Sequence, residues 1–211
     1  MPLPKLLPLF VLASCAVASS ALPTRILQVR SSLVQILYRE TAAHPYQTIC
    51  SGGQVALESG VKLLSAGHCV EEDPSGEYAA LDSQHQLHPL ALERWEHDWG
   101  KKVDYALFAK VEGLPALKSD YRPIEVGENV FSWSGPLGLA LMPLRGYFLE
   151  YLDLPTDDQE EEGMGLSTLE ADGGASGSVV LDSRGQARAI LVGAWTTSVK
   201  LDGSLFVPLP H

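Results

Sequence analysis

Hydrophobic residues occur in short runs from Ile26 onward, and Gly, Pro, Asp and Ser separate one run from the next. The runs are rich in Val, Ile, Leu, Tyr and Phe, which favour β-strands over helices. They predict strands at residues 34–38, 54–57, 61–64, 105–110, 130–133, 146–151, 178–181, 187–195 and 204–207. No segment with helical periodicity longer than about three turns is convincing. The pattern therefore predicts an all-β sandwich or barrel.

The strand pattern is interrupted over residues 113–123, where Gly and Pro cluster. We expect a boundary there, with one barrel over about 26–115 and a second over about 124–208. Each half holds about 90 residues, which is enough for one small barrel. The acidic stretch 157–162 is interpreted as a solvated loop, with cation binding as the alternative.

The first 21 residues differ from the rest of the chain. Lys5 precedes an apolar run over residues 6–12, and small residues follow, which is typical of an export signal. The run is too short to predict a stable membrane span. Cleavage could follow Ala18 or Ala21, and we expect the folded domain over residues 22–211. Residues 12–15 also resemble a bacterial lipobox, which would place a lipid anchor on Cys15. The chain is expected to be secreted, periplasmic or attached to the cell envelope.

Composition narrows the function classes. The chain has 211 residues, of which 45% are hydrophobic, and a formal net charge of −11. Such an acidic chain is not expected to bind nucleic acid or anionic membrane surfaces, which favour dense Lys and Arg. Three cysteines occur, and removal of Cys15 with the signal leaves Cys50 and Cys69. In an exported protein this pair predicts one disulfide, with two buried thiols as the alternative.

Three short segments carry candidate chemistry. Residues 65–69 read Ser-Ala-Gly-His-Cys, residues 104–107 read Asp-Tyr-Ala-Leu, and residues 174–178 read Gly-Ala-Ser-Gly-Ser. A serine becomes a useful nucleophile when a histidine takes its proton and an acid fixes the tautomer of that histidine. Glycines beside the serine allow a tight turn whose amide NH groups converge on a developing oxyanion.

The order of these residues along the chain separates the known kinds of catalytic triad. The order Ser, acid, His fails because the only histidine after Ser176 is the terminal His211. The order Asp, His, Ser fails because no aspartate precedes His68. The order that remains is His68, Asp104, Ser176.

With these motifs the sequence resembles the trypsin-like (chymotrypsin-like) serine peptidases over roughly residues 26–208. Residues 50–53, Cys-Ser-Gly-Gly, and the histidine motif are similar to the first part of that family, and residues 135–138 to a segment of its simpler bacterial and viral members. The resemblance implies two packed six-stranded antiparallel barrels with the active site in the cleft between them. It also implies a bridge between Cys50 and Cys69.

The resemblance assigns a role to each motif residue. It implies a serine endopeptidase that hydrolyses polypeptide substrates through an acyl-enzyme and needs no cofactor. His68 would be the general base and acid, Asp104 would orient it, and Ser176 would attack the substrate. The backbone NH groups of Gly174 and Ser176 would form the oxyanion hole.

Four positions bear on regulation and specificity. Ala175 stands where secreted animal enzymes of the family carry aspartate, and Ser178 stands where most members have proline. Glu170 lies six residues before Ser176 and would either form the base of a pocket for Arg or Lys or be solvated. Trp195 would either lie on an edge that pairs with substrate backbone or belong to the core.

A metal site and a function without catalysis are the two alternatives to this interpretation. His85, His88 and His97 suggest a metal site, but no thiolate or helical carboxylate motif accompanies them, so we expect surface histidines and no metal. A catalytically weak or inactive protein of the same fold, acting as a binding or regulatory protein, is the alternative function. The presence of all three triad residues favours the enzyme.

Overall fold

The structure is a computed structural model, and it describes residues 22–70, 72–135, 140–152, 164–196 and 202–211. For 195, 196 and 202 only the backbone is described. The expected signal with Cys15, most of the segment 135–138 and the acidic stretch 157–162 lie outside these residues. The described helices are α1 (Thr24–Gln28), η1 (Val29–Ser32) and η2 (Gly67–Cys69). None of them has the length and apolar character that crossing a bilayer requires.

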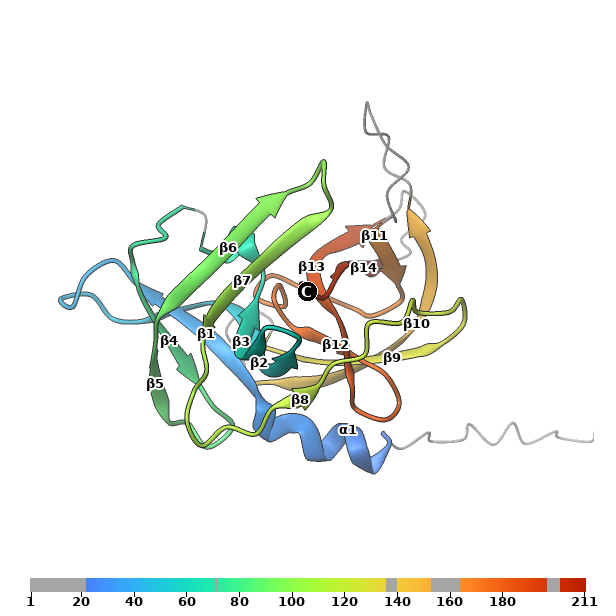
Figure 1. The fold of residues 1–211 in the computed structure, drawn as a ribbon, viewed down its shortest axis with the longest axis horizontal. Coiled ribbons are helices and arrows are strands. Elements are labelled where there is room, and N and C mark those ends of the chain that lie inside the picture. Colours follow the sequence, from blue (N-terminus) through green and yellow to red (C-terminus); the bar gives the residue numbers. More distant parts are fainter. Residues whose placement is uncertain (1–21, 71, 136–139, 153–163, 197–201) are drawn as a thin grey trace, which may run out of the picture.

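The first half of the chain forms an eight-stranded, strongly curved sheet (Figure 1). Its strands are β1 (Leu33–Arg39), β2 (Gln47–Leu57), β3 (Gly60–Ser65), β4 (Glu77–Leu81), β5 (Leu87–Leu90), β6 (Leu92–Asp98), β7 (Val103–Ala109) and β8 (Leu117–Lys118). Seven strands follow the order β5-β4-β1-β2-β3-β7-β6, and β8 pairs in parallel with β2.

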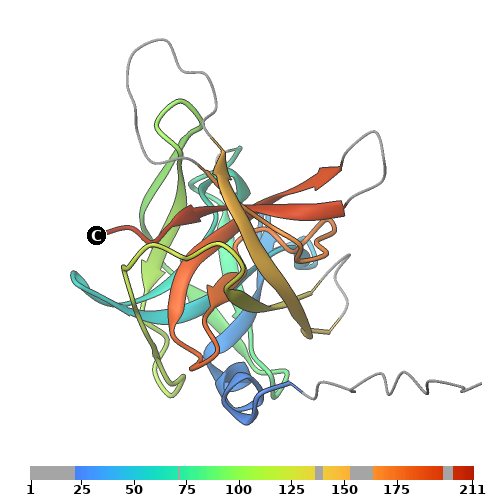
Figure 2. The ribbon, with the colours of Figure 1, turned by 90° about the vertical axis from the view of Figure 1, so that its right-hand side faces the viewer.

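The second half forms a closed six-stranded barrel in the order β10-β11-β14-β13-β12-β9. Its strands are β9 (Asn129–Ser134), β10 (Met142–Leu152), β11 (Met164–Ser167), β12 (Val179–Leu181), β13 (Ala187–Thr196) and β14 (Asp202–Pro208). Every ladder in this barrel is antiparallel. Figure 2 shows β13 and β14 side by side as a long antiparallel pair.

The chymotrypsin-like arrangement expected from the sequence is confirmed, although the first unit has eight strands where six were expected and includes the parallel pair of β2 and β8. That unit is a half-barrel sheet, because β5 and β6 form no ladder with each other in the described part of the chain. All nine predicted strands are present, but β4, β5, β6, β8 and β11 were not predicted. The edge strands β5 and β6 contain a proline and several charged residues, which protect a sheet edge and hide the strand pattern.

The buried side chains form three clusters. One fills the first sheet and one fills the second barrel. The third lies between the two and draws residues from both. Along β7, Ala106 and Phe108 face the first cluster, whereas Tyr105 and Leu107 face the third. Because both faces of such strands are buried, their sequences read as continuous apolar runs without alternation.

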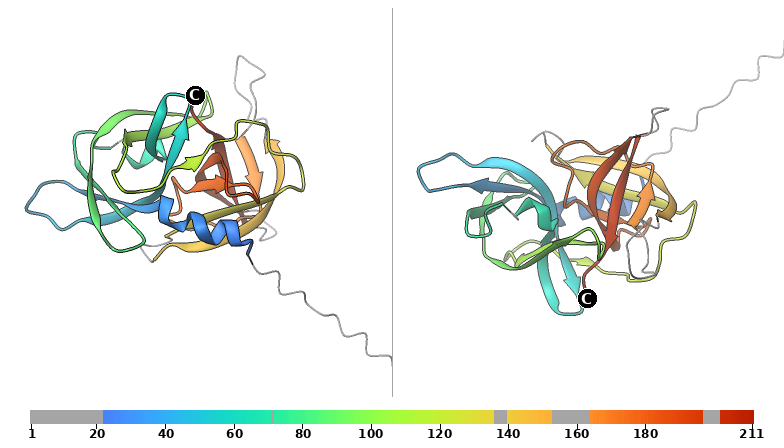
Figure 3. Two further views of the ribbon diagram at one scale, coloured as in Figure 1. Left: turned by 60° about the horizontal axis from the view of Figure 1, so that its bottom comes forward. Right: turned by 90° about the horizontal axis from the view of Figure 1, so that it is seen from above.

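The segment before β1 packs against the second barrel, as Figure 3 shows for α1. Ile26 is fully buried, and its carbonyl accepts a hydrogen bond of 2.8 Å from the indole NH of Trp133 on β9. The start of the described chain therefore belongs to the packing between the two units, although its next strand belongs to the first.

Arg188 on β13 joins the second barrel to the connection that precedes it. Its side chain is only 3% exposed. It donates to Glu128 at 3.1 Å and to the carbonyls of Arg122 and Pro123 at 2.6 and 2.8 Å, and it lies 3.9 Å from Asp120. The pKa of Asp120 lies well below its usual value, because Arg122 donates hydrogen bonds to its carboxylate and Arg188 adds positive charge.

We predict that Arg188→Met lowers the free energy of unfolding by about 3 kcal/mol, because it leaves carboxylates and carbonyls without their buried donor. Arg122→Ala, at an exposed site, should cost under about 1 kcal/mol.

The same ion pair makes stability depend on pH. Unfolded Asp120 binds its proton at higher pH than folded Asp120. Its contribution to stability is therefore present above about pH 4 and is lost as the pH falls. Urea unfolding at pH 7 and pH 3 measures both effects, and equal losses for the two variants would contradict this account.

Candidate active site

His68 is positioned by the short turn that follows β3. Ser65 ends the strand, and His68 lies in η2 immediately after Gly67. A side chain at Gly67 would overlap the backbone carbonyl oxygens of Glu96 and Tyr105. Only glycine therefore lets this turn pack closely against β6 and β7. This close approach brings His68 beside the start of β7.

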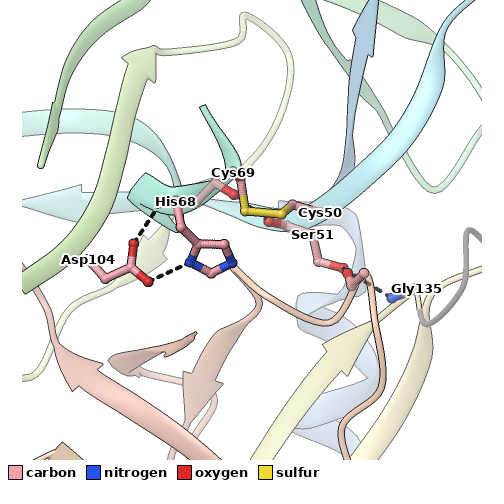
Figure 4. The surroundings of a disulfide bond; sticks show 8 residues. Cys50, Ser51, His68, Cys69, Asp104 and Gly135 are labelled. Atoms are coloured by element: carbon pink, nitrogen blue, oxygen red, sulfur yellow. Dashed lines mark hydrogen bonds and ion pairs between the residues drawn. A yellow bond between two sulfur atoms is a disulfide. The ribbon is translucent and has the colours of Figure 1, made fainter. Parts of the chain in front are cut away.

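Asp104 meets His68 because β3 and β7 pair in antiparallel register, with Ser65 opposite Ala106. Its carboxylate accepts two hydrogen bonds from His68, one from Nδ1 at 2.6 Å and one from the backbone NH at 2.8 Å (Figure 4). Asp104 is fully buried, whereas the His68 side chain is 29% exposed. A carboxylate that accepts from Nδ1–H leaves Nε2 as the basic nitrogen of neutral imidazole.

The serine loop lies in the second barrel, between β11 and β12. Gly174 and Gly177 have φ values of +90° and +81°, a region that favours glycine. The backbone NH of Ala175 donates to Asp172 at 2.9 Å, and that of Gly177 donates to Leu191 at 2.7 Å. Within the described residues, no hydrogen bond uses the NH of Gly174 or Ser176.

Ser51 on β2 brings the serine loop to the first sheet. Its backbone NH donates to the carbonyl of Ser176 at 2.8 Å. The approach is close, since a side chain at Gly177 would overlap the Ser51 carbonyl oxygen and the Ser65 hydroxyl. With glycine at position 177, the Ser65 hydroxyl donates a hydrogen bond to the Ser51 carbonyl at 2.8 Å. The glycine after Ser176 is therefore required by packing between the two units as well as by its φ.

A pocket of about 370 Å³ contains the candidate reacting groups. His68 and Ser176 both line it, and no hydrogen bond joins their side chains in the described structure. Such contacts often tighten only when substrate binds. The lining includes Glu72 and Asp73 and contains no Lys or Arg.

Two tyrosines that line this pocket, Tyr38 and Tyr78, bind Asp73, which also lines it. Tyr38 donates through its hydroxyl to the Asp73 carboxylate at 3.0 Å, and Tyr78 donates to the Asp73 carbonyl at 2.6 Å. Hydrogen bonds from Ser75 and Tyr38 lower the pKa of Asp73, while burial raises the pKa of Tyr78 to about 12. This part of the pocket therefore carries the negative charge of Asp73 beside two neutral tyrosine hydroxyls.

Cys50 and Cys69 are bridged, and the disulfide lies directly beside His68 (Figure 4). These three residues are the only group of potential metal ligands found among the described residues. Because both sulfurs belong to the disulfide, they supply no thiolate, and the group is not suited to a metal. Two of the histidines considered as metal ligands are not part of this group. Nε2 of His88 lies 2.9 Å from the Asp82 carboxylate, and His85 is exposed.

The other candidate residues do not gather at this pocket. Glu170 is exposed and is not among the residues that line the described pocket, and its role at the base of a specificity pocket stays a prediction. Trp195 lies on β13, where its backbone pairs with Gly203, and its side chain lies outside the described part. The sequence suggests His97 only as a metal ligand, but in the structure the centroid of its ring lies 5.8 Å from that of the His68 ring. The pairing of His97 with Asp104 across β6 and β7 explains this position.

Solved structures of bacterial proteases are similar over most of this chain. The active form of the Rv3671c protease from M. tuberculosis matches 88% of it and 79% of its own chain, with 17% identity and a TM-score of 0.66. A serine endoprotease from Yersinia pestis matches 88% and 61%, with 14% identity and a TM-score of 0.68. The HtrA-type protease AlgW, solved with a decapeptide, matches 89% and 64%, with 13% identity and a TM-score of 0.69.

The chain has the chymotrypsin-like fold. No protein-family model and no curated protein matches it. At these identities the likeness to solved structures establishes the fold alone. In this chymotrypsin-like fold the described pocket draws on β1, β2, η2 and β4 of the first sheet and on the serine loop of the second barrel. The site thus depends on contact between the two units.

We predict that the Cys50→Ala/Cys69→Ala double variant loses about 3 kcal/mol of unfolding free energy, because the bridge closes a short loop in the unfolded chain. Urea unfolding measures the loss. The unaltered protein in a strong reductant is the control and should approach the variant. A variant within about 0.5 kcal/mol of the oxidised protein would show that the bridge does not constrain the chain.

Proposed function

We propose that this chain is a serine endopeptidase with Ser176 as nucleophile, His68 as general base and acid, and Asp104 as the residue that orients His68. One observation carries the proposal. Asp104, fully buried, accepts the Nδ1 proton of His68, and His68 and Ser176 line one pocket. This combination supports Nε2 of His68 as the base for a serine nucleophile in the same pocket, as the mechanism requires.

Acylation begins when Ser176 Oγ forms a bond to the substrate carbonyl carbon and its proton passes to His68 Nε2. The negative charge on the carbonyl oxygen is stabilised by the NH groups of Gly174 and Ser176. His68 then gives the proton to the leaving amine as the C–N bond breaks. In deacylation a water loses a proton to His68 and attacks the ester carbon. His68 then returns this proton to Ser176 Oγ as the Oγ–C bond breaks and the acid leaves.

Export to an oxidising compartment is part of the proposal. Its support is the disulfide between Cys50 and Cys69, together with the signal pattern of the first 21 residues. Polypeptides are the proposed substrates, with no cofactor. A lipid anchor at Cys15 remains the alternative to release of the mature chain.

We predict that Ser176→Ala and His68→Ala each reduce peptide hydrolysis by more than about 10⁴-fold, and that the double variant loses little more, because the residues act as one unit. Asp104→Asn should fold and lose about 10⁴-fold, since it favours the wrong imidazole tautomer. Steady-state kinetics on a fluorogenic peptide library measures all four. Hydrolysis by Ser176→Ala at the unaltered rate would refute the assignment and favour the binding or regulatory function.

The serine loop also bears on activation. Ala175 is fully buried among the side chains of Phe148, Leu169 and Phe206 in the core of the second barrel. It offers no charge to an inserted amino terminus, and burying an ammonium in that core would cost several kcal/mol. We therefore propose that the site does not depend on release of a new N-terminus.

We predict that a protein with additional residues fused before Leu22 hydrolyses peptides with kcat/KM within about twofold of one that begins at Leu22. The physical reason is that no charged partner for the terminus stands at Ala175. The comparison requires the same peptide and matched active-site concentrations. Activity that appears only after the extension is trimmed would contradict this account.

A further inference from the structure

Ser51 has no role in the triad, yet its hydrogen bonds converge on the serine loop. It follows Cys50 on β2 and is fully buried. Its backbone NH donates to Ser176, and its carbonyl accepts from Ser65. Its hydroxyl, drawn beside the disulfide in Figure 4, makes two further contacts across the boundary between the first sheet and the second barrel.

The two partners of this hydroxyl fix its orientation. It donates to the carbonyl oxygen of Gly174 at 2.9 Å and accepts from the backbone NH of Gly135 at 3.1 Å. A carbonyl can only accept and an amide NH can only donate, so the single hydroxyl proton must point at Gly174. Ser51 thus takes part in four hydrogen bonds, through its NH, its carbonyl and twice through its hydroxyl, and this network holds its side chain in one orientation.

Gly174 is the residue that most needs an anchor. It has no side chain to restrict its backbone, and its φ of +90° lies in a region that favours glycine. Within the described residues, the hydroxyl of Ser51 is the only hydrogen-bond donor to the Gly174 carbonyl. The NH of Ala175 belongs to the same planar peptide unit and donates to Asp172, so Asp172 holds one side of this unit and the Ser51 hydroxyl holds the other.

We propose that Ser51 is a positioning residue whose hydroxyl holds the Gly174 carbonyl and thereby keeps the Gly174 and Ser176 NH groups directed at the oxyanion. The proposal rests on the proposed peptidase function. Ser51 supplies a side-chain hydrogen bond from the first sheet, which the apolar side chain of Ala175 cannot supply from within the loop. It touches no reacting atom and acts only through Gly174.

The first test compares Ser51→Ala with Ser132→Ala. Ser132 is an equally buried serine whose hydroxyl donates to the Val179 carbonyl at 3.0 Å, and it makes no described contact with the serine loop. Both variants lose one buried hydroxyl, so a general loss of stability should affect both alike. We expect kcat to fall about 10- to 100-fold in Ser51→Ala, with KM within threefold, and to stay within twofold in Ser132→Ala.

Two further kinetic readings separate positioning from general damage. The inhibition constant of a peptidyl trifluoromethyl ketone, whose adduct carries an oxyanion, should rise in Ser51→Ala by the same factor as kcat falls. Ser51→Thr keeps the hydroxyl and should recover most of the lost kcat. Unchanged kcat in Ser51→Ala, or equal losses in Ser51→Ala and Ser132→Ala, would overturn the proposal.

A measurement without catalysis separates this proposal from the peptidase function. Amide hydrogen exchange of a peptide that spans Gly174 and Gly177 should quicken at least tenfold in Ser51→Ala and not in Ser132→Ala. If the unaltered protein hydrolysed no peptide, the proposed function would fail, and exchange would still decide whether Ser51 holds the loop. Unchanged exchange in Ser51→Ala would overturn the anchor whether or not the protein is active.

Discussion

The hydrogen bond from the Ser51 backbone NH to the Ser176 carbonyl joins the two units where the proposed chemistry takes place. His68 and Asp104 belong to the first sheet and Ser176 belongs to the second barrel, so neither unit holds a triad by itself. Catalysis of this kind tolerates little displacement, and a misplacement of about 1 Å can cost 100-fold in rate. Gly177 lets the two units approach closely at this point, and the apolar cluster between them draws residues from both.

Burial of Asp104 links the fold of the first sheet to the proposed function. A carboxylate removed from water is costly unless it is paired and hydrogen-bonded. Asp104 is fully buried, and both of its hydrogen bonds described here come from His68, one from the ring and one from the backbone. The histidine turn therefore stabilises the acid, while the acid fixes the imidazole. Gly67 makes this arrangement possible by letting the turn approach β6 and β7.

The local motifs that carry the candidate catalytic residues could be predicted from the sequence, whereas contacts between residues far apart in the chain could not. Residues 65–69, 104–107 and 174–178 predicted which side chains the structure gathers, because each motif carries its own turn or strand. Strands with both faces buried, such as β7, were visible as apolar runs. The short β11 was not, because Gly165 disfavours a strand in isolation, although the Phe206 ring fills the space a side chain would need. The sequence gives no signal for the role of Ser51, because the partners of its hydroxyl lie 84 and 123 residues away in the chain.

Reaction with a fluorophosphonate probe tests the central claim most directly, because the probe forms a covalent bond only with a serine activated by its surroundings. The native protein should take up one probe, and mass spectrometry of the digest should locate it on Ser176. Heat-denatured protein, which keeps the same serines without the site, should take up none. A native protein that stays unlabelled, or that carries the probe on another serine, would contradict the assignment of Ser176 as the nucleophile.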